Sequence, residues 1–252
     1  MPAALTCVLS YGLMCSPAEV VDVPTPTPLE PVAAADPPDP DPADPTPSTP
    51  STPPKGKATL ILTQVQGFYD GTTDLRAAFT QTHVNAVYNT KTVSKGTLKV
   101  KKPGKMVWDY ADEKNPDIWV SGKTVHVVEL DTKQVVKRTL DTSDFAGAEK
   151  FLFGGRKLLD DFRVRMAKKT LAERYGMKGH SVVELAPKKK NPHYDRLLLV
   201  VDDATGRVDS FIVRNTDKST NRFDLAKIER NPGQADSVFD FSKPKGFIVI
   251  TD

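Results

Sequence analysis

The 252-residue chain has 35 basic and 32 acidic side chains, 21 prolines and two cysteines, and these are unevenly distributed. Residues 24–54 hold thirteen of the prolines and no aromatic residue, so this stretch cannot bury enough apolar surface to offset its ordering entropy. Cys7 and Cys15 both precede it, which excludes a disulfide or a thiolate metal site in the remainder. We expect one folded domain over residues 57–252, long enough for one sizeable core.

Charge divides at the same boundary. Residues 1–54 contain seven acidic side chains and no lysine or arginine, which leaves 35 basic and 25 acidic side chains, a net charge of +10, in residues 55–252. A basic domain favours anionic partners such as lipid headgroups or nucleic acid. A lysine-rich, solvated surface with no such partner is the alternative interpretation.

The N-terminal segment resembles an export signal. Residues 3–14 form a mostly apolar run of about 12, too short for a bilayer-spanning helix of roughly 20 residues, although the usual preceding positive charges are missing. Cys15 follows Gly-Leu-Met, as in a lipoprotein processing site. We predict that residues 1–21 are an export signal or a lipid-anchor segment, with lipidation of Cys15 as an open alternative. Residues 22–56 would be a disordered, acidic tether of roughly 100 Å in polyproline form.

The folded domain begins with a predicted helix over residues 58–69, because its apolar side chains recur every three or four positions. Asp70-Gly71 ends it. Leu75, Ala77 and Phe79 then alternate with more polar residues, which predicts a half-buried strand.

A β-hairpin follows over residues 96–110. Pro103-Gly104 suits a tight turn, since proline presets φ and glycine tolerates a positive φ. Met106, Trp108 and Tyr110 stand at every second position, so they share one face of the second strand.

The remainder alternates short strands with few helices. A second hairpin spans 118–130 and includes Trp119, a further strand covers 134–140, an apolar-striped helix spans 143–154 and includes Phe151, and a turn or short helix covers 156–162. We predict strands over 162–170, 180–187, 194–201, 207–214, 221–229 and 247–251. The fold class is therefore mainly β, a strongly curved antiparallel sheet or barrel, with no parallel βαβ units. Residues 197–201 are apolar on both faces, so one face should meet the interior and the other a helix or neighbouring segment.

No catalytic or cofactor motif is visible. The four histidines lack zinc-protease spacing, and the sequence has neither a Gly-x-Ser-x-Gly elbow nor a phosphate-binding glycine loop. Acidic neighbours of the aromatic residues, such as Asp109 and Asp240, weigh against single-stranded nucleic acid as a partner. We predict a protein that is no enzyme and needs no cofactor or metal.

The order of these segments resembles the LolA family of periplasmic lipoprotein carriers. The similarity covers residues 58–251 and is strongest in LRAAFTQ (75–81), GTLKVKKPGKMVWDY (96–110) and VFDFSKPKGFIVI (238–250). The resemblance implies an incompletely closed antiparallel β-barrel with a helical lid, an α+β fold, and a cavity between barrel and lid that receives the acyl chains of a lipoprotein.

The resemblance also implies site residues. Trp108 matches the family's cavity tryptophan, Met106 an apolar position near the rim, and Leu75 and Phe79 apolar strand positions. Lys102 stands where the family has an arginine that bonds to backbone carbonyls of the lid, and it lacks the planar guanidinium fork. The predicted lipid-binding cavity comprises Leu75, Phe79, Leu98, Met106, Trp108, Trp119, Phe151 and Phe211, with Lys102 as the lid latch.

The function implied is that of a monomeric carrier of acylated lipoproteins in the periplasm. It would receive them from an inner-membrane lipoprotein-releasing transporter and deliver them to an outer-membrane acceptor, with no nucleic acid involved. The alternative is an anchored lipid- or glycolipid-binding acceptor, or an envelope sensor, of the LolB-like type. An anchored form would be tethered to a membrane through the N-terminus.

Overall fold

The computed structural model describes residues 56–139 and 157–251. The predicted export or anchor segment with Cys15, the tether, and the helix over 143–154 with Phe151 lie outside the described residues. The first element of the described part of the chain is helix α1 (Lys57–Asp70).

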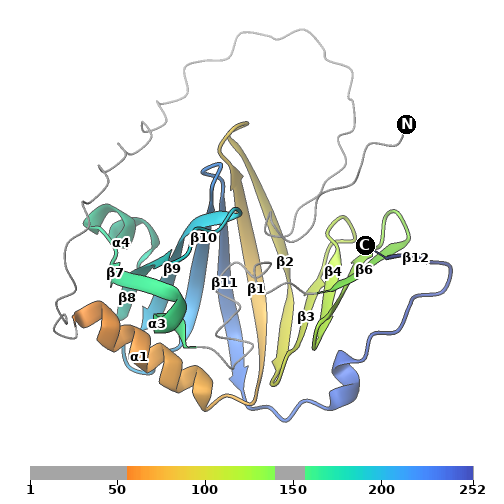
Figure 1. Cartoon of the computed structure of the whole chain (residues 1–252), viewed down its shortest axis with the longest axis horizontal. Helices are drawn as coiled ribbons and strands as arrows, with labels where there is room; N and C mark the ends of the chain where they lie inside the picture. Colours follow the sequence, from red (N-terminus) through yellow and green to blue (C-terminus); the bar gives the residue numbers. More distant parts are fainter. Residues whose placement is uncertain (1–55, 140–156, 252) are drawn as a thin grey trace, which may run out of the picture. The chain divides into compact units, whose positions relative to one another are not determined.

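One twelve-stranded sheet dominates the described part of the chain (Figure 1). Its order is β12-β6-β5-β4-β3-β2-β1-β11-β10-β9-β8-β7. Among the described strands, β12 pairs in parallel with β6, and the other pairs are antiparallel. The strands are β1 (Asp74–Asn85), β2 (Thr90–Lys101), β3 (Lys105–Tyr110), β4 (Asp117–Ser121), β5 (Thr124–Glu129), β6 (Gln134–Thr139), β7 (Phe162–Met166), β8 (His180–Pro187), β9 (Tyr194–Asp202), β10 (Val208–Asn215), β11 (Thr220–Arg230) and β12 (Ile248–Thr251).

The sheet is not closed, because the terminal strands β7 and β12 do not pair with each other within the described ranges. In the ranges 56–139 and 157–251 it is accompanied by α1, α3 (Leu158–Asp161), α4 (Lys169–Tyr175) and the 3-10 helix η1 (Asp236–Phe239). This arrangement confirms the predicted mainly β fold, an incompletely closed antiparallel barrel with a covering helix. None of the helices in the described residues is long and apolar enough to cross a membrane.

Helix α1 forms because its apolar residues fall on one stripe. Ala58, Ile61, Leu62, Val65 and Tyr69 are buried, three or four positions apart. The helix packs against α3, β7 and β8 and contributes to the main core. The helix predicted over 58–69 is confirmed, and it is longer by one residue at each end.

A second, smaller core lies on the other face of the sheet. Leu198 and Val200 of β9 pack there with Leu171 and Tyr175 of α4, whereas Leu199 joins the main core. The prediction that 197–201 is covered on both faces is confirmed, and α4 is the element that covers the second face.

Two local predictions were wrong. The strand predicted over 162–170 ends at Met166, and the chain forms α4 from Lys169 because Leu171, Ala172 and Tyr175 have helical spacing and meet the apolar outer face of β9. The last strand, β12, pairs in parallel with β6, since the chain runs along η1 before returning to that edge.

Candidate functional site: an apolar inner face beneath helix α1

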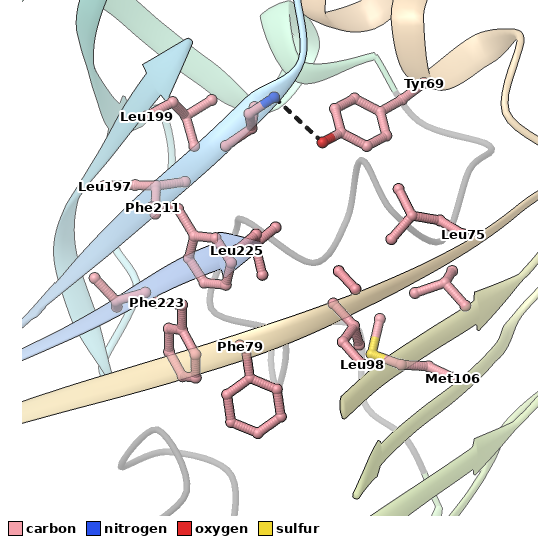
Figure 2. Close-up of a cluster of buried hydrophobic side chains, with 14 of the residues drawn as sticks. Tyr69, Leu75, Phe79, Leu98, Met106, Leu197, Leu199, Phe211, Phe223 and Leu225 are labelled. Carbon is pink, nitrogen blue, oxygen red and sulfur yellow. Dashed lines mark hydrogen bonds between the residues drawn. The ribbon is translucent and has the colours of Figure 1, made fainter. Parts of the chain in front are cut away.

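The inner face of the sheet carries a continuous set of buried apolar side chains (Figure 2). Leu75, Leu98 and Met106 come from three neighbouring strands and lie close to one another in the view. Strand register explains the grouping, because Leu75 and Met106 both pair with Val100, which lies two residues from Leu98 on the same face of β2. Each of the six predicted residues Leu75, Phe79, Leu98, Met106, Trp108 and Phe211 is at most 2% exposed.

Aromatic rings link the two halves of this face. The Phe79 ring meets the Trp108 ring edge-on with centroids 4.9 Å apart, and Trp108 lies 5.2 Å from Phe223. Phe223 stacks on Phe211 at 4.7 Å. The Trp108 indole Nε1 donates to the Met106 sulfur at 3.0 Å, so its polar atom is paired within the apolar cluster.

The inner face becomes polar next to the aromatic rings of Phe79 and Phe223, two residues along each strand. Gln81 and Asn221 are fully buried on the same faces of β1 and β11 as Phe79 and Phe223. Tyr110 Oη donates to Gln81 Oε1 at 2.7 Å, and Gln81 Nε2 donates to Asn221 Oδ1 at 3.1 Å. His83 Nδ1 lies 3.0 Å from the same Asn221 oxygen. The face can therefore contact both an apolar chain and a polar group attached to it.

Two cations bind the C-terminal end of α1. Lys102 Nζ donates to the backbone carbonyl of Tyr69, the kind of contact that the resemblance implies for this position. Arg230 Nη2 donates to the preceding carbonyl, of Phe68, at 3.1 Å, and Arg230 Nε donates to Thr72 Oγ1 at 3.0 Å. Its guanidinium also lies over the Phe68 ring, 4.6 Å from the centroid. Cations at this end complement the helix dipole.

The Lys102 ammonium is partly withdrawn from water. Burial lowers its pKa below the ordinary lysine value, and the nearby Arg230 charge lowers it further, while the Asp70 carboxylate acts in the opposite direction. Partial burial of the ammonium group therefore costs free energy, and the hydrogen bond of Lys102 to α1 offsets part of that cost.

The structure corrects the placement of Trp119. In the β3–β4 register, Trp119 pairs with Val107 and Ile118 pairs with Trp108, so Trp119 lies on the face opposite to Trp108. It packs against Phe241, which stacks on His126 at 4.1 Å, and all three line an outer groove of about 360 Å³. The size of Trp119 suggested that it lines the cavity, but its position in the strand places it on the outer face of the sheet.

Sequence reasoning missed Phe223, Asn221 and Arg230. The first two lie in a correctly predicted strand, where alternation from Leu225 would have placed them on the inner face. No local signal marks Arg230, because its partners are 158 and 162 residues away in the sequence.

A polar cluster lies apart from this face. His180, Asp202 and Asp209 bring candidate ligand atoms within 4.8 Å of one another. Arg207 Nη2 donates to Asp209 Oδ2 at 2.9 Å, and His180 Nε2 lies 2.8 Å from the same oxygen. The carboxylate is already paired with cationic or protonatable groups, so these residues form an ion-pair network.

Comparison with known proteins decides the family. Residues 70–242 match the family model described as outer membrane lipoprotein carrier protein LolA. The chain belongs to the LolA family. Curated proteins named outer-membrane lipoprotein carrier protein are 28% identical in Cupriavidus taiwanensis, over 74% of this chain and 86% of that protein, and 27% identical in Ralstonia nicotianae, over 75% and 86%.

Solved structures of similar fold are more distant. A LolA superfamily protein from Nitrosomonas europaea has a TM-score of 0.41 and 11% identity, over 73% of this chain and 97% of that chain. A Thermus thermophilus protein has a TM-score of 0.48 and 9% identity, over 77% and 98%.

Proposed function

We propose that this LolA-family protein carries lipoproteins through the periplasm by housing their acyl chains against the inner face of the sheet, beneath α1. The observation that supports this most directly is the unbroken set of apolar and aromatic side chains running from Met106 to Phe211 across five adjacent strands, β3, β2, β1, β11 and β10. The names of the curated relatives favour the same cargo.

The energetics require such a surface. Burial of an acyl chain is worth about 0.8 kcal/mol per methylene, so a chain leaving a bilayer loses on the order of 10 kcal/mol unless it is rehoused. A carrier must offer apolar contacts of comparable quality and still release the chain. In the closed arrangement described here, the apolar side chains contact one another, and a bound chain would replace some of those contacts.

Helix α1 is the element that we propose moves. Lys102 and Arg230 hold its C-terminal carbonyls with a few hydrogen bonds from partly exposed side chains, and such bonds can be exchanged for bonds to water at small net cost. In this scheme an inner-membrane transporter supplies the lipoprotein and an outer-membrane acceptor removes it.

The two tryptophans provide a direct test, because they lie on opposite faces of the sheet. A Trp119→Phe variant retains only Trp108, and a Trp108→Phe variant retains only Trp119. We expect a cysteinyl peptide with two brominated acyl chains to quench the fluorescence of Trp108 and to leave Trp119 unaffected. Equal quenching of the two, or none, would contradict acyl-chain binding on the inner face.

Carrier and acceptor roles are separated by a transfer assay. A carrier loaded with acylated lipoprotein should pass it to outer-membrane vesicles, and depletion of the protein should leave lipoproteins in the inner membrane. An anchored acceptor or a sensor would bind the same probe without supporting net transfer.

A further inference from the structure

The amide of Asn221 is an unusual feature of the inner face. Its side chain is completely buried, and its oxygen accepts from Gln81 Nε2 and contacts His83 Nδ1. Its Nδ2 has no hydrogen-bond partner in the part of the chain that the structure describes. A buried amide donor without an acceptor is costly, and a side chain that retains one calls for a physical explanation.

A second amide repeats the pattern on the neighbouring strand. Asn215 is 2% exposed and its Nδ2 is also unpartnered among the described residues. It lies two residues beyond Val213, which pairs with Asn221, so both asparagines are at the same end of the β10–β11 pair. Two buried amide groups with unused donors therefore lie at one end of the inner face.

The position of these donors relative to the aromatic rings defines what they can reach. Gln81 pairs with Phe223 and His83 pairs with Asn221, so the polar side chains begin level with the Phe223 ring on β1 and two residues from that ring on β11. An amphiphile whose chain lies along Phe79, Phe223 and Phe211 would place the polar group at the end of that chain beside Asn221.

The chemistry of the donors selects a neutral acceptor. The polar side chains at this end of the inner face are Gln81, His83, Asn215 and Asn221, so they include no lysine or arginine. Lys95 belongs to the opposite face, because it pairs with Thr80. A carboxylate or phosphate would be buried without a strong cationic partner, which is unfavourable. A carbonyl oxygen accepts hydrogen bonds without carrying a full charge.

We propose that Asn221, assisted by Asn215, donates hydrogen bonds to an acyl carbonyl oxygen of the bound lipid. The inference rests on the proposed function and adds a polar recognition element to an apolar site. The carbonyl comes either from the glyceryl esters or from the N-acyl amide of a lipidated cysteine. Because Asn221 is buried, the contact forms once the apolar side chains have parted around the chain.

The test compares two probes with the same peptide, one with ester-linked diacylglyceryl chains and one with ether-linked dialkyl chains of equal length. We expect the full-length protein to bind the ester probe about five- to tenfold more tightly, as one or two net hydrogen bonds would give. Asn221→Ala removes the amide donor and buries no charge. It should reduce the ester-to-ether ratio to about one while leaving ether affinity nearly unchanged.

Two further variants guard against trivial outcomes. Asn221→Leu should also abolish the ratio, and thermal unfolding would show that both Asn221 variants remain folded. Asn191→Ala is the matched control, because the Asn191 oxygen accepts from the His193 and Tyr194 backbone amides in a loop, and its ratio should equal that of the unmodified protein. An ether probe carrying an N-acyl amide that recovers tight binding would assign the contact to the amide carbonyl.

The results separate this proposal from the carrier function. Equal binding of the ester probe, the ether probe and the N-acylated ether probe by the unmodified protein would overturn the role of Asn221 and leave acyl-chain binding intact. Unchanged differences between the probes in the folded Asn221 variants would do the same. Failure of every probe to bind would overturn both.

Discussion

Lys102 and Arg230 donate to successive backbone carbonyls of helix α1, those of Tyr69 and Phe68. Lys102 lies at the turn between β2 and β3, and Arg230 is the last residue of β11. The lysine supplies one directional bond, whereas the arginine also bonds to Thr72 and lies over the Phe68 ring. A planar guanidinium thus reaches the end of the helix from a different strand than the family resemblance suggests.

Removal of either cation should loosen α1. We expect Lys102→Met and Arg230→Met each to lower the free energy of unfolding by about 1 kcal/mol, as partly exposed charge-assisted hydrogen bonds are lost. Binding of a hydrophobic dye to the inner face should become faster in both variants, and faster still in the double variant. Urea unfolding and stopped-flow fluorescence measure the two effects.

Lys105 is the matched control for this pair. It lies three residues after Lys102 and forms an exposed ion pair with Asp236 at 2.7 Å. Lys105→Met should change stability by less than about 0.5 kcal/mol and leave dye binding unchanged. Identical behaviour of all three variants would show that positive charge in general, rather than the bonds to α1, governs opening.

Much of the fold follows from short-range patterns. Alternation of Met106, Trp108 and Tyr110 predicts the buried face of β3, and Pro103-Gly104 predicts the turn before it. These features depend on neighbours in sequence, so they are visible without the structure. The predicted inner-face positions Phe79 and Trp108 are correct for the same reason, since both lie on strands with clear alternation.

Three of the missed or misplaced features, Trp119, α4 and Arg230, depend on distant partners. Trp119 has strand spacing like Trp108, but only the pairing with Val107 shows that it faces outward. Helix α4 depends on the outer face of β9, and Arg230 depends on carbonyls of α1. Where both faces of a strand carry apolar side chains, as in β4 and β9, local sequence does not show which face packs on the main core or what covers the other.

Charge placed on the two faces of the sheet should have unequal effects. Trp108→Glu introduces a carboxylate among Phe79, Phe223 and Met106, where it cannot be solvated. We expect acyl-probe binding to be abolished and the free energy of unfolding to fall by at least about 3 kcal/mol. Calorimetric titration and urea unfolding are the measurements.

Trp119→Glu provides the comparison. Trp119 is only half-buried, in the outer groove with Phe241. We expect acyl-probe affinity to remain within about twofold and stability to fall less than in Trp108→Glu. Loss of binding in Trp119→Glu with normal folding would show that the outer groove, rather than the inner face, receives the lipid.

Helix α1 offers a matched pair of leucines for measuring how strongly it is packed. Leu62 is fully buried, whereas Leu60 is 53% exposed on the same helix. We expect Leu62→Ala to cost about 2–5 kcal/mol, from lost transfer free energy and the cavity left behind, and Leu60→Ala to cost about 0.5 kcal/mol or less. Similar losses in both variants would contradict the orientation of the helix.

The His180–Asp209 pair should give the stability a defined pH dependence. Burial lowers the pKa of His180, but the hydrogen bonds to Asp209 and to the Lys178 carbonyl, with the charges of Asp209 and Asp202, outweigh it and raise the pKa above the ordinary value of about 6.5. The pKa of Asp209 is held low; burial opposes this, but its bonds to Arg207 and His180 outweigh the burial, so Asp209 stays ionised as His180 titrates.

A raised histidine pKa means that the folded state binds the proton more tightly than the unfolded state does. The contribution of the His180–Asp209 pair to the free energy of unfolding is therefore fully present below about pH 6.5. It is lost as the pH rises through the pKa of His180 in the folded state. We expect the difference in unfolding free energy between the unmodified protein and His180→Gln to be largest near pH 5.5 and to shrink by pH 8.5. Asp209→Asn should remove the same pH dependence. A difference that is constant across this range would show that His180 contributes by packing alone.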